Sequence, residues 1–438
     1  LNKMVTFIIR DYPDLDHIFP LIHYFLKKKE SITVLNFEIN LDLNSDPRII
    51  FLNNNYKNNL IIYDVYNVKG QRFLIDWLIN FLSSTKYKKV NFKNLENIKK
   101  SNNFFNLYFL ILICFLKRII FSSKTFFEKY FFNDKWANNI INKIDVTSLV
   151  LDDSYYFNYI RPQSFINICK AKKIDITLVP HTCHMFTRKE DIDNLKSKKL
   201  KNFYPNIVVT SNKMKSVFNS CGIGFSQIKN LGSARFSQEN VSFLESIYNI
   251  NAKFSEKMVI DKKLKVLYID GAYDDNYEKK KLIEHVSKLS FIELIVKAHP
   301  RGIFLSSQIA MKNKQFKKDS FSNFSIDIST PTKILIEHSD VIIGTYSSVL
   351  IEAMLSYKKI ILPRFFLKDK LNFKIFYEEH GFAEVCVNLR QVISSLHSFK
   401  KDVMIKQDVK EKTNIFIQEY VYGGNLNSSK ILENYYQL

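Results

Sequence analysis

The chain of 438 residues has only five cysteines, and no two of them form a CxxC pair. They are Cys114, Cys169, Cys183, Cys221 and Cys386. Structural zinc sites need closely spaced thiolates, and disulfide frameworks need many cysteines in a short chain. The sequence indicates neither, and we expect a protein of a reducing cytoplasm that needs no metal or other cofactor.

The sequence also lacks an apolar run long enough to cross a membrane. The longest stretch, residues 104–121, is interrupted by Lys117 and Arg118, and its unbroken part is shorter than the roughly 18–20 residues of a span. Two interpretations stay open: a helix packed inside the protein, or a helix lying on the inner face of the cytoplasmic membrane. The apolar run that begins at Met4 is too short for a signal peptide.

Nucleic-acid-binding motifs are absent too, although the formal net charge is +21. The lysines are scattered rather than clustered as an arm, and no zinc-finger spacing or RNP-like motif occurs. We therefore predict no nucleic-acid partner. The charge favours anionic partners, which are phosphorylated substrates or an acidic membrane surface.

What the sequence does contain is an alternation of short apolar runs with helix-length segments. The runs are continuous, which is typical of strands buried on both faces of a parallel sheet. We expect strands at residues 4–9, 32–37, 60–65, 148–153, 176–180, 206–211, 265–270, 292–300, 340–345, 359–365 and 383–388. We expect helices at residues 14–29, 71–84, 212–220, 277–289, 332–338, 347–357, 389–399, 406–420 and 428–437.

This alternation predicts an α/β protein of two Rossmann-like, doubly wound domains that face each other across a cleft. We place the first domain at residues 1–250, with an aromatic and basic helical insertion at about 85–146, and the second at 258–438. In such folds ligands bind at the carboxyl ends of the strands, so candidate site residues are expected there.

The stretch "VIIGTYSSVLIEAM" joins the end of a predicted strand to the start of a helix. Gly344 ends the strand, Ser347 and Ser348 fall in the first turn of the helix, and Glu352 follows one turn later. Unpaired N–H groups and the helix dipole favour a phosphate at such a helix start, and two hydroxyls add donors. The alternative is that one serine simply caps the helix.

A second stretch, "LIVKAHPRG", places Lys297, His299, Pro300 and Arg301 at another strand end. Proline fixes the backbone there, which would direct the histidine toward a ligand. Histidine and arginine can both bind phosphate, and arginine can do so with two hydrogen bonds. An ordinary backbone contact of the histidine is the alternative.

These two stretches resemble the C-terminal domain of bacterial GT-B glycosyltransferases that build surface polysaccharides. The resemblance spans roughly residues 265–365 and is strongest to sialyltransferases and Kdo transferases, which use CMP-sugars and share an His-Pro and a Ser-Ser motif. It implies that His299 and Pro300 contact the nucleotide and that the two serines hold its phosphate. The CDP-glycerol glycerophosphotransferases are similar in the same region.

Two groups compete for the role of general base in the first domain. "LVLDDSYYF" carries Asp152 and Asp153 at a strand end and is similar to the Asp-Asp-Gly stretch of sialyltransferases, although Ser154 replaces the glycine. "LVPHTCHMF" carries His181, which resembles the histidine proposed as base in the glycerophosphotransferases, although a threonine follows it. A carboxylate or an imidazole can take the proton of an acceptor hydroxyl. A helix cap and a buried histidine are the respective alternatives.

Two further turns belong to the candidate donor site. "NLGSARFSQ" offers Arg235 to the phosphate of a donor, or forms an interdomain hinge. "YIDGAYDDN" places Gly271 in a tight turn near the nucleotide. Asp274 and Asp275 in the same stretch lack an Asp-x-Asp arrangement and are expected in a solvated loop.

The sequence thus predicts a metal-independent glycosyltransferase of capsule or lipopolysaccharide synthesis. Its partners are a nucleotide-activated donor, with a CMP-sugar favoured, and a glycan or lipid-linked glycan acceptor. Three alternatives stay open: a polyol-phosphate transferase that uses CDP-glycerol, a UDP-sugar 2-epimerase, and a basic membrane-associated binding protein without enzymatic activity.

Overall fold

A computed structural model describes most of the chain. The described residues are 4–10, 12–37, 42–65, 133–153, 163–181, 204–248, 263–271, 276–298, 324–327, 330–345, 347–366, 380–401, 406–424 and 428–438. They divide into two compact units. The first contains the described residues up to His181 together with Tyr204–Ile207, and the second contains those from Val208 to Leu438.

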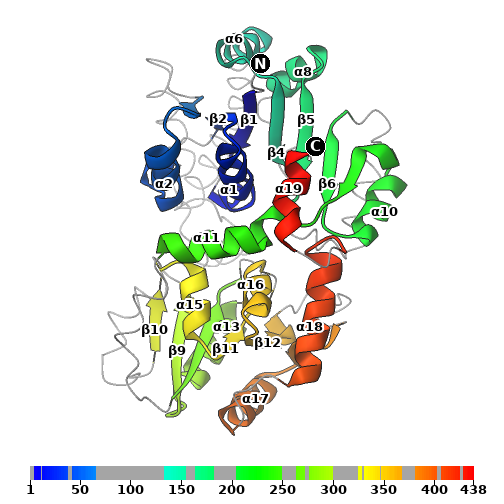
Figure 1. Cartoon of the computed structure of the whole chain (residues 1–438). Helices are drawn as coiled ribbons and strands as arrows, with labels where there is room; N and C mark the ends of the chain where they lie inside the picture. The colour runs from blue at the N-terminus through cyan, green and yellow to red at the C-terminus, as the bar shows by residue number, and fades with distance from the viewer. Residues whose placement is uncertain are drawn as a thin grey trace, which may run out of the picture. The chain divides into compact units, whose positions relative to one another are not determined.

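The first sheet has seven strands in the order β3-β2-β1-β4-β5-β6-β7 (Figure 1). Its strands are β1 (Met4–Ile9), β2 (Ser31–Asn36), β3 (Leu60–Asp64), β4 (Ser148–Asp152), β5 (Asp175–Val179), β6 (Asn206–Val209) and β7 (Ile228–Asn230). The pairs from β3 through β6 are parallel. Strands β1, β2 and β4 are almost wholly buried, as their continuous apolar runs require.

Six described helices alternate with the strands of this sheet or follow its last strand. They are α1 (Tyr12–Lys27), α2 (Pro47–Tyr56), α6 (Asp134–Ile144), α8 (Gln163–Ala171), α10 (Asn212–Ser220) and α11 (Gln238–Tyr248). Asp46, Asn133 and Ser211 each accept a backbone N–H in the first turn of α2, α6 and α10, respectively. Short 3-10 turns occur at Leu43–Ser45, Phe225–Gln227 and Ala234–Phe236.

The second sheet has six strands in the order β10-β9-β8-β11-β12-β13. They are β8 (Leu264–Ile269), β9 (Ile292–Lys297), β10 (Phe324–Asp327), β11 (Val341–Ile343), β12 (Lys359–Pro363) and β13 (Glu384–Cys386). All these pairs are parallel. The chain leaves β8 toward β9 on one side and returns to β11 on the other, so the strand order reverses between β8 and β11. Ligands of doubly wound sheets bind outside the carboxyl ends at such a reversal.

Helices cover both faces of this second sheet. They are α13 (Asn276–Val286), α15 (Thr332–His338), α16 (Val349–Leu355), α17 (Leu389–Lys401) and α18 (Gln407–Tyr420). A 3-10 turn at Ser428–Lys430 and the helix α19 (Ile431–Tyr436) follow α18 in the chain. Leu267 and Ile269 of β8 pack in one core with α15, α16 and α18. Val266 and Tyr268 pack in a second core with α13 and α17. Successive residues of β8 thus serve opposite faces.

The predicted α/β class with two doubly wound, parallel sheets is confirmed, and every predicted strand lies at its expected place within a few residues. Strands β7 and β10 and the helices α2, α8 and α11 were not predicted. The predicted helix 71–84, most of the insertion 85–146 and the segment 104–121 lie outside the described residues. Among the described residues, none of the helices combines the length and the hydrophobicity of a membrane span. The boundary near residue 250 stays a prediction.

Residues 230–233 and 421–424 of the second unit approach each other so closely that Gly232 and Gly423 have no room for a side chain. Gly232 has a φ of +85°, and a Cβ added to it would lie 2.8 Å from the carbonyl carbon of Tyr422. The Ser233 N–H donates to the carbonyl of Val421 at 2.8 Å. The hydroxyl of Tyr435 donates to the carbonyl of Gly232, also at 2.8 Å. Residues 230–233 are therefore held against the end of α18.

Replacing Gly232 by alanine should lower the free energy of unfolding by about 3 kcal/mol, because the new methyl group meets backbone in a left-handed conformation. Gly424→Ala is the matched control: its φ is +81°, but an added Cβ meets nothing within 4 Å among the described residues. It should cost about 1 kcal/mol from the backbone conformation alone. Urea unfolding of both variants measures the difference, and equal costs would contradict the close approach.

Candidate functional site

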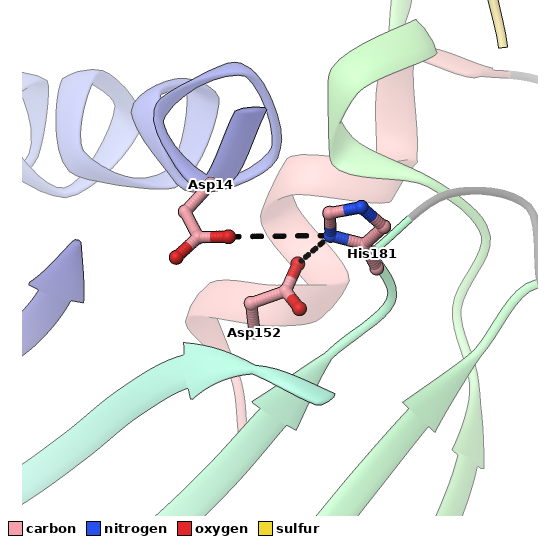
Figure 2. Close-up of side chains that lie close together, drawn as sticks. All are labelled: Asp14, Asp152 and His181. Carbon is pink, nitrogen blue, oxygen red and sulfur yellow. Dashed lines mark hydrogen bonds and ion pairs between the residues drawn. The ribbon is translucent and has the colours of Figure 1, made fainter. Parts of the chain in front are cut away.

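Charged side chains gather around His181 at the carboxyl ends of strands in the first unit (Figure 2). Asp152 is the last residue of β4, and His181 follows β5. Asp14 lies in the first turn of α1, directly after β1. Since parallel strands end at the same edge of a sheet, residues distant in the sequence meet here.

The imidazole of His181 is held at one ring nitrogen. Its Nδ1 lies 2.8 Å from Oδ2 of Asp152 and 4.0 Å from Oδ1 of Asp14. The backbone N–H of His181 donates to Oδ1 of Asp153 at 3.0 Å. Nδ1 therefore donates to Asp152, and within the described part of the chain Nε2 has no hydrogen-bond partner. With 29% of the His181 side chain exposed, Nε2 is the ring nitrogen left for a substrate.

Asp14 is buried and carries its own counter-ion. The backbone N–H of Arg10 donates to Oδ2 of Asp14 at 3.0 Å, and the Arg10 guanidinium donates to Oδ1 at 3.2 Å. The carboxylate thus lies between two cations, the guanidinium and the imidazolium of His181. This arrangement offsets the large cost of burying the Asp14 charge.

A second histidine packs on the first. The ring of buried His17, one turn after Asp14 in α1, lies with its centroid 5.0 Å from that of His181 at an interplanar angle of 48°. This contact and the Asp152 hydrogen bond restrict both the tilt and the rotation of the His181 ring. The geometry is suited to a positioned acid or base.

The carboxylates around His181 set its protonation state. Burial by itself would lower the pKa of His181, but the charge and hydrogen bond of Asp152 and the charges of Asp153 and Asp14 outweigh it. Together they raise the pKa of His181 to about 9. Without a substrate, the imidazole is therefore mostly protonated at neutral pH.

Asp14, Asp152 and His181 could also hold a metal ion, because their ligand atoms lie within 4.8 Å of one another. They are the one such group among the described residues. The Arg10 guanidinium on Asp14 and the proton shared by His181 and Asp152 already supply the positive charge that a metal would bring. The donor set therefore suits a proton-transfer pair better than a cation site.

The structure joins the two candidate bases that the sequence presented as rivals. Asp152, Asp153 and His181 form one group, in which Asp153 binds a backbone N–H and Asp152 binds the imidazole. Arg10, Asp14 and His17 also contribute to this group and were not predicted from the sequence. Their signal was present, since the polar stretch "RDYPDLDH" follows the first buried strand directly.

The second unit places the paired serines where β11 turns into α16. Gly344 follows β11, and a Cβ added to it would lie 3.4 Å from both Ile269 and Leu350. The hydroxyl of Ser347 accepts the backbone N–H of Val349 at 3.3 Å. Ser347 thus acts in part as a helix cap, which is the alternative that the sequence left open.

Three predicted donor-site residues meet at this turn. The Arg235 guanidinium donates to Oε1 of Glu352 at 2.6 Å and to the hydroxyl of Ser348 at 3.5 Å. Both charged side chains are mostly buried, at 14% and 17% exposure. Glu352 therefore holds the guanidinium beside the serine that begins α16.

Of the remaining predicted site residues, the structure describes Lys297 and Gly271 only. Lys297, at the end of β9, donates to the carbonyl of Thr330 at 2.7 Å and to the carboxylate of Asp327 at 3.3 Å. Burial alone would raise the pKa of Asp327, but hydrogen bonds from Thr330 and the Lys297 ammonium lower it below its usual value. Gly271 lies buried just after β8. The predicted residues His299, Pro300 and Arg301, with Asp274 and Asp275, lie outside the described residues.

Comparisons with known proteins identify a fold. No protein-family model matches the sequence, and no curated protein matches it either. Among solved structures, the UDP-GlcNAc 2-epimerase of Methanocaldococcus jannaschii matches with a TM-score of 0.57 at 14% identity, over 99% of this chain and 100% of that one. The UDP-GlcNAc 2-epimerase of Neisseria meningitidis bound to UDP-GlcNAc matches with a TM-score of 0.57 at 11% identity, again over 99% and 100%.

The structure of a glycosyltransferase of kitacinnamycin is similar to this chain as well, with a TM-score of 0.53 at 9% identity over 99% of this chain and 98% of that one. At such low sequence identity, structural similarity shows a shared fold only. The chain has the two-domain, Rossmann-like GT-B-type fold that these epimerases and glycosyltransferases share. The fold alone does not assign an activity.

The pKa of His181 predicts a specific pH dependence of stability. Because the folded value of about 9 exceeds the usual 6.5, the pairing stabilises the folded protein fully below pH 6.5 and is lost as the pH rises to about 9. The difference in unfolding free energy between wild type and His181→Gln should therefore shrink by about 3 kcal/mol over this range. Urea unfolding at several pH values measures it.

His23→Gln is the matched control on the same helix α1. Burial, with the charge of Lys27, lowers the pKa of His23 to about 4. Its protonation therefore destabilises the fold only as the pH falls below 6.5, and the His23→Gln difference should stay constant from pH 6.5 to 9. A constant difference for His181→Gln over the same range would contradict the pairing.

Proposed function

We propose that this protein is a nucleotide-sugar-dependent glycosyltransferase in which His181, oriented by Asp152, is the general base. The observation that carries the proposal is the hydrogen bond from Nδ1 to Asp152, which leaves Nε2 as the accessible nitrogen at the carboxyl edge of a parallel sheet. Such a pair is suited to taking a proton from an acceptor hydroxyl.

In the proposed reaction, Nε2 of His181 takes the proton of the acceptor hydroxyl while the acceptor oxygen bonds to the anomeric carbon. The bond from that carbon to the phosphate of the donor breaks, and the nucleotide leaves with the electron pair. Asp152 stabilises the imidazolium that forms. Its charge makes His181 a stronger base, since proton affinity rises with pKa.

The high pKa of His181 gives this mechanism a distinctive pH dependence. Only about one His181 side chain in a hundred is deprotonated at pH 7 when the pKa is about 9. Transfer that uses the neutral imidazole becomes faster up to about pH 9. A His181 that instead acted as a cationic hydrogen-bond donor would lose its effect above that pH.

The donor's phosphate is proposed to bind where β11 turns into α16. Gly344 keeps the turn free of a side chain, Ser347 and Ser348 offer hydroxyls, and the Arg235 guanidinium lies 3.5 Å from the hydroxyl of Ser348. These groups stabilise the negative charge that grows on the leaving phosphate without a metal ion. His299, Pro300 and Arg301 are proposed to contribute to the same nucleotide.

A CMP-sugar of the sialic-acid or Kdo type is the donor that the sequence motifs favour, and a glycan or lipid-linked glycan is the proposed acceptor. The proposed setting is capsule or lipopolysaccharide synthesis on the cytoplasmic side of the membrane. The Neisseria epimerase was solved with UDP-GlcNAc, so UDP-sugars belong in the same test. A UDP-sugar 2-epimerase remains the second candidate, because the same His181–Asp152 pair could abstract a carbon-bound proton.

His181→Gln and Asp152→Asn should each reduce sugar transfer by about 10²–10⁴-fold, because one removes the base and the other its orienting carboxylate. His23→Gln, which replaces a half-buried histidine on α1, is the control and should keep wild-type activity. Transfer from radiolabelled CMP- and UDP-sugars is measured with EDTA present and with and without an acceptor glycan. Full activity of His181→Gln would overturn the assignment, and sugar conversion without acceptor would indicate the epimerase.

A nucleotide that binds the native protein should raise its melting temperature. We expect a shift with CMP, measured beside CDP, UDP and GDP, and its loss in the Ser347→Ala/Ser348→Ala double variant. Ser356→Ala, at the other end of α16, is the control and should keep the shift. A shift with CDP alone would favour the polyol-phosphate transferase, and one with UDP would favour a UDP-sugar enzyme. Binding only to generic nucleic acid, with steep salt dependence, would favour the non-enzymatic alternative.

A further inference from the structure

A lysine ammonium is buried at the carboxyl edge of the second sheet. Lys279 lies near the start of α13, and only 4% of its side chain is exposed. Its Nζ donates to Oδ1 of Asp270 and to the carbonyl of Gly271, both at 2.5 Å. Asp270 is buried as well, with 2% of its side chain exposed. The ammonium thus ties the helix to the turn that follows β8.

That turn lies at the reversal of strand order. Asp270 follows β8, which has β9 on one side and β11 on the other. The Asp270 N–H donates to the carbonyl of Lys297 at the end of β9, at 3.0 Å. On the other side, a Cβ added to Gly344 after β11 would lie 3.4 Å from the Cβ of Ile269, the last residue of β8. Lys279 therefore holds the backbone between the two strand ends where a nucleotide is proposed to bind.

Stability alone is a weak reason for this pair. A buried ion pair is typically no more stabilising than apolar side chains of similar volume. Lys279 is the one buried lysine among the residues that the structure describes, and its neighbours on α13, Leu282 and Ile283, belong to the apolar core. An aliphatic side chain would suit that environment, whereas only a donor can fasten both the Asp270 carboxylate and the Gly271 carbonyl.

We propose that Lys279 is a positioning residue of the donor site: with Asp270, it fixes the turn after β8 in the conformation that binds the nucleotide. This inference rests on the proposed function. Lys279 itself does not touch the reacting atoms. Its effect is to keep the carbonyl of Gly271 engaged with the protein, so that the turn cannot rotate this acceptor toward a negatively charged phosphate.

The test separates positioning from stability by removing both charges. In Lys279→Met/Asp270→Leu, no buried charge is left unpaired, so the ligand-free melting temperature should stay within a few degrees of wild type. The Gly271 carbonyl loses its donor, and the nucleotide dissociation constant should rise at least tenfold. The dissociation constant is measured by isothermal titration calorimetry on wild type and the double variant, with whichever of CMP, CDP, UDP and GDP most stabilises wild type. The temperature of the titration is kept well below the melting temperature of each protein.

Lys358→Met is the matched control in the same unit. Lys358 is half-buried and donates to the carbonyl of Glu337 at 2.9 Å, just before β12 and hence at the amino edge of the same sheet. It should alter stability and leave the nucleotide dissociation constant unchanged. Wild-type affinity in the double variant overturns the role of Lys279 while leaving the proposed function intact. No binding of any nucleotide to wild type overturns both.

If the double variant does not fold, Lys279→Arg decides the question. A guanidinium keeps the positive charge, but its planar fork cannot place one nitrogen at the position of Nζ between both acceptors. We expect a folded protein whose nucleotide dissociation constant is raised about threefold to tenfold. Wild-type affinity of this variant would overturn the proposal, because a positioning role depends on that geometry.

Discussion

Parallel strand pairing is the constraint on which both candidate sites depend. Because the strands from β1 to β5 run in the same direction, their carboxyl ends deliver Arg10, Asp152 and His181 to one edge. The same rule brings the ends of β8, β9 and β11 together in the second sheet. Polar residues collect at these edges because the strands themselves are buried on both faces and must be apolar.

Four carboxylates that are buried or mostly buried at these edges each form an ion pair with a positively charged side chain. The pairs are Asp14–Arg10, Asp152–His181, Asp270–Lys279 and Glu352–Arg235. Each pair joins an element to a strand end or to the turn that follows one. An unpaired charge there would cost several kcal/mol, so the pairs hold the backbone of the edges in a defined conformation. In one of them, Asp152 with His181, the Nε2 nitrogen of the imidazole has no hydrogen-bond partner among the described residues.

The fold was largely predictable because its signal is local. Continuous apolar runs such as "MVTFII" and "KVLYI" mark strands buried on both faces, and the structure contains each of them. Strand β10 escaped prediction because its four residues are only partly buried and have no such run. Helix α2 escaped because its sequence, "PRIIFLNNNY", has a weak helical pattern and depends on its Asp46 cap and on packing.

The sequence by itself determined the class of the fold and the residues at the strand ends, since hydrophobic runs set which segments are buried and polar residues must follow them. It left Asp153 and His181 as rivals, and the polar stretch that contains Asp14 carried no sign that this residue lies beside them. Only the tertiary structure decided this, through the register in which Asp152 of β4 pairs with Val179 of β5. That register brings His181 within 2.8 Å of Asp152, a distance that no local pattern encodes.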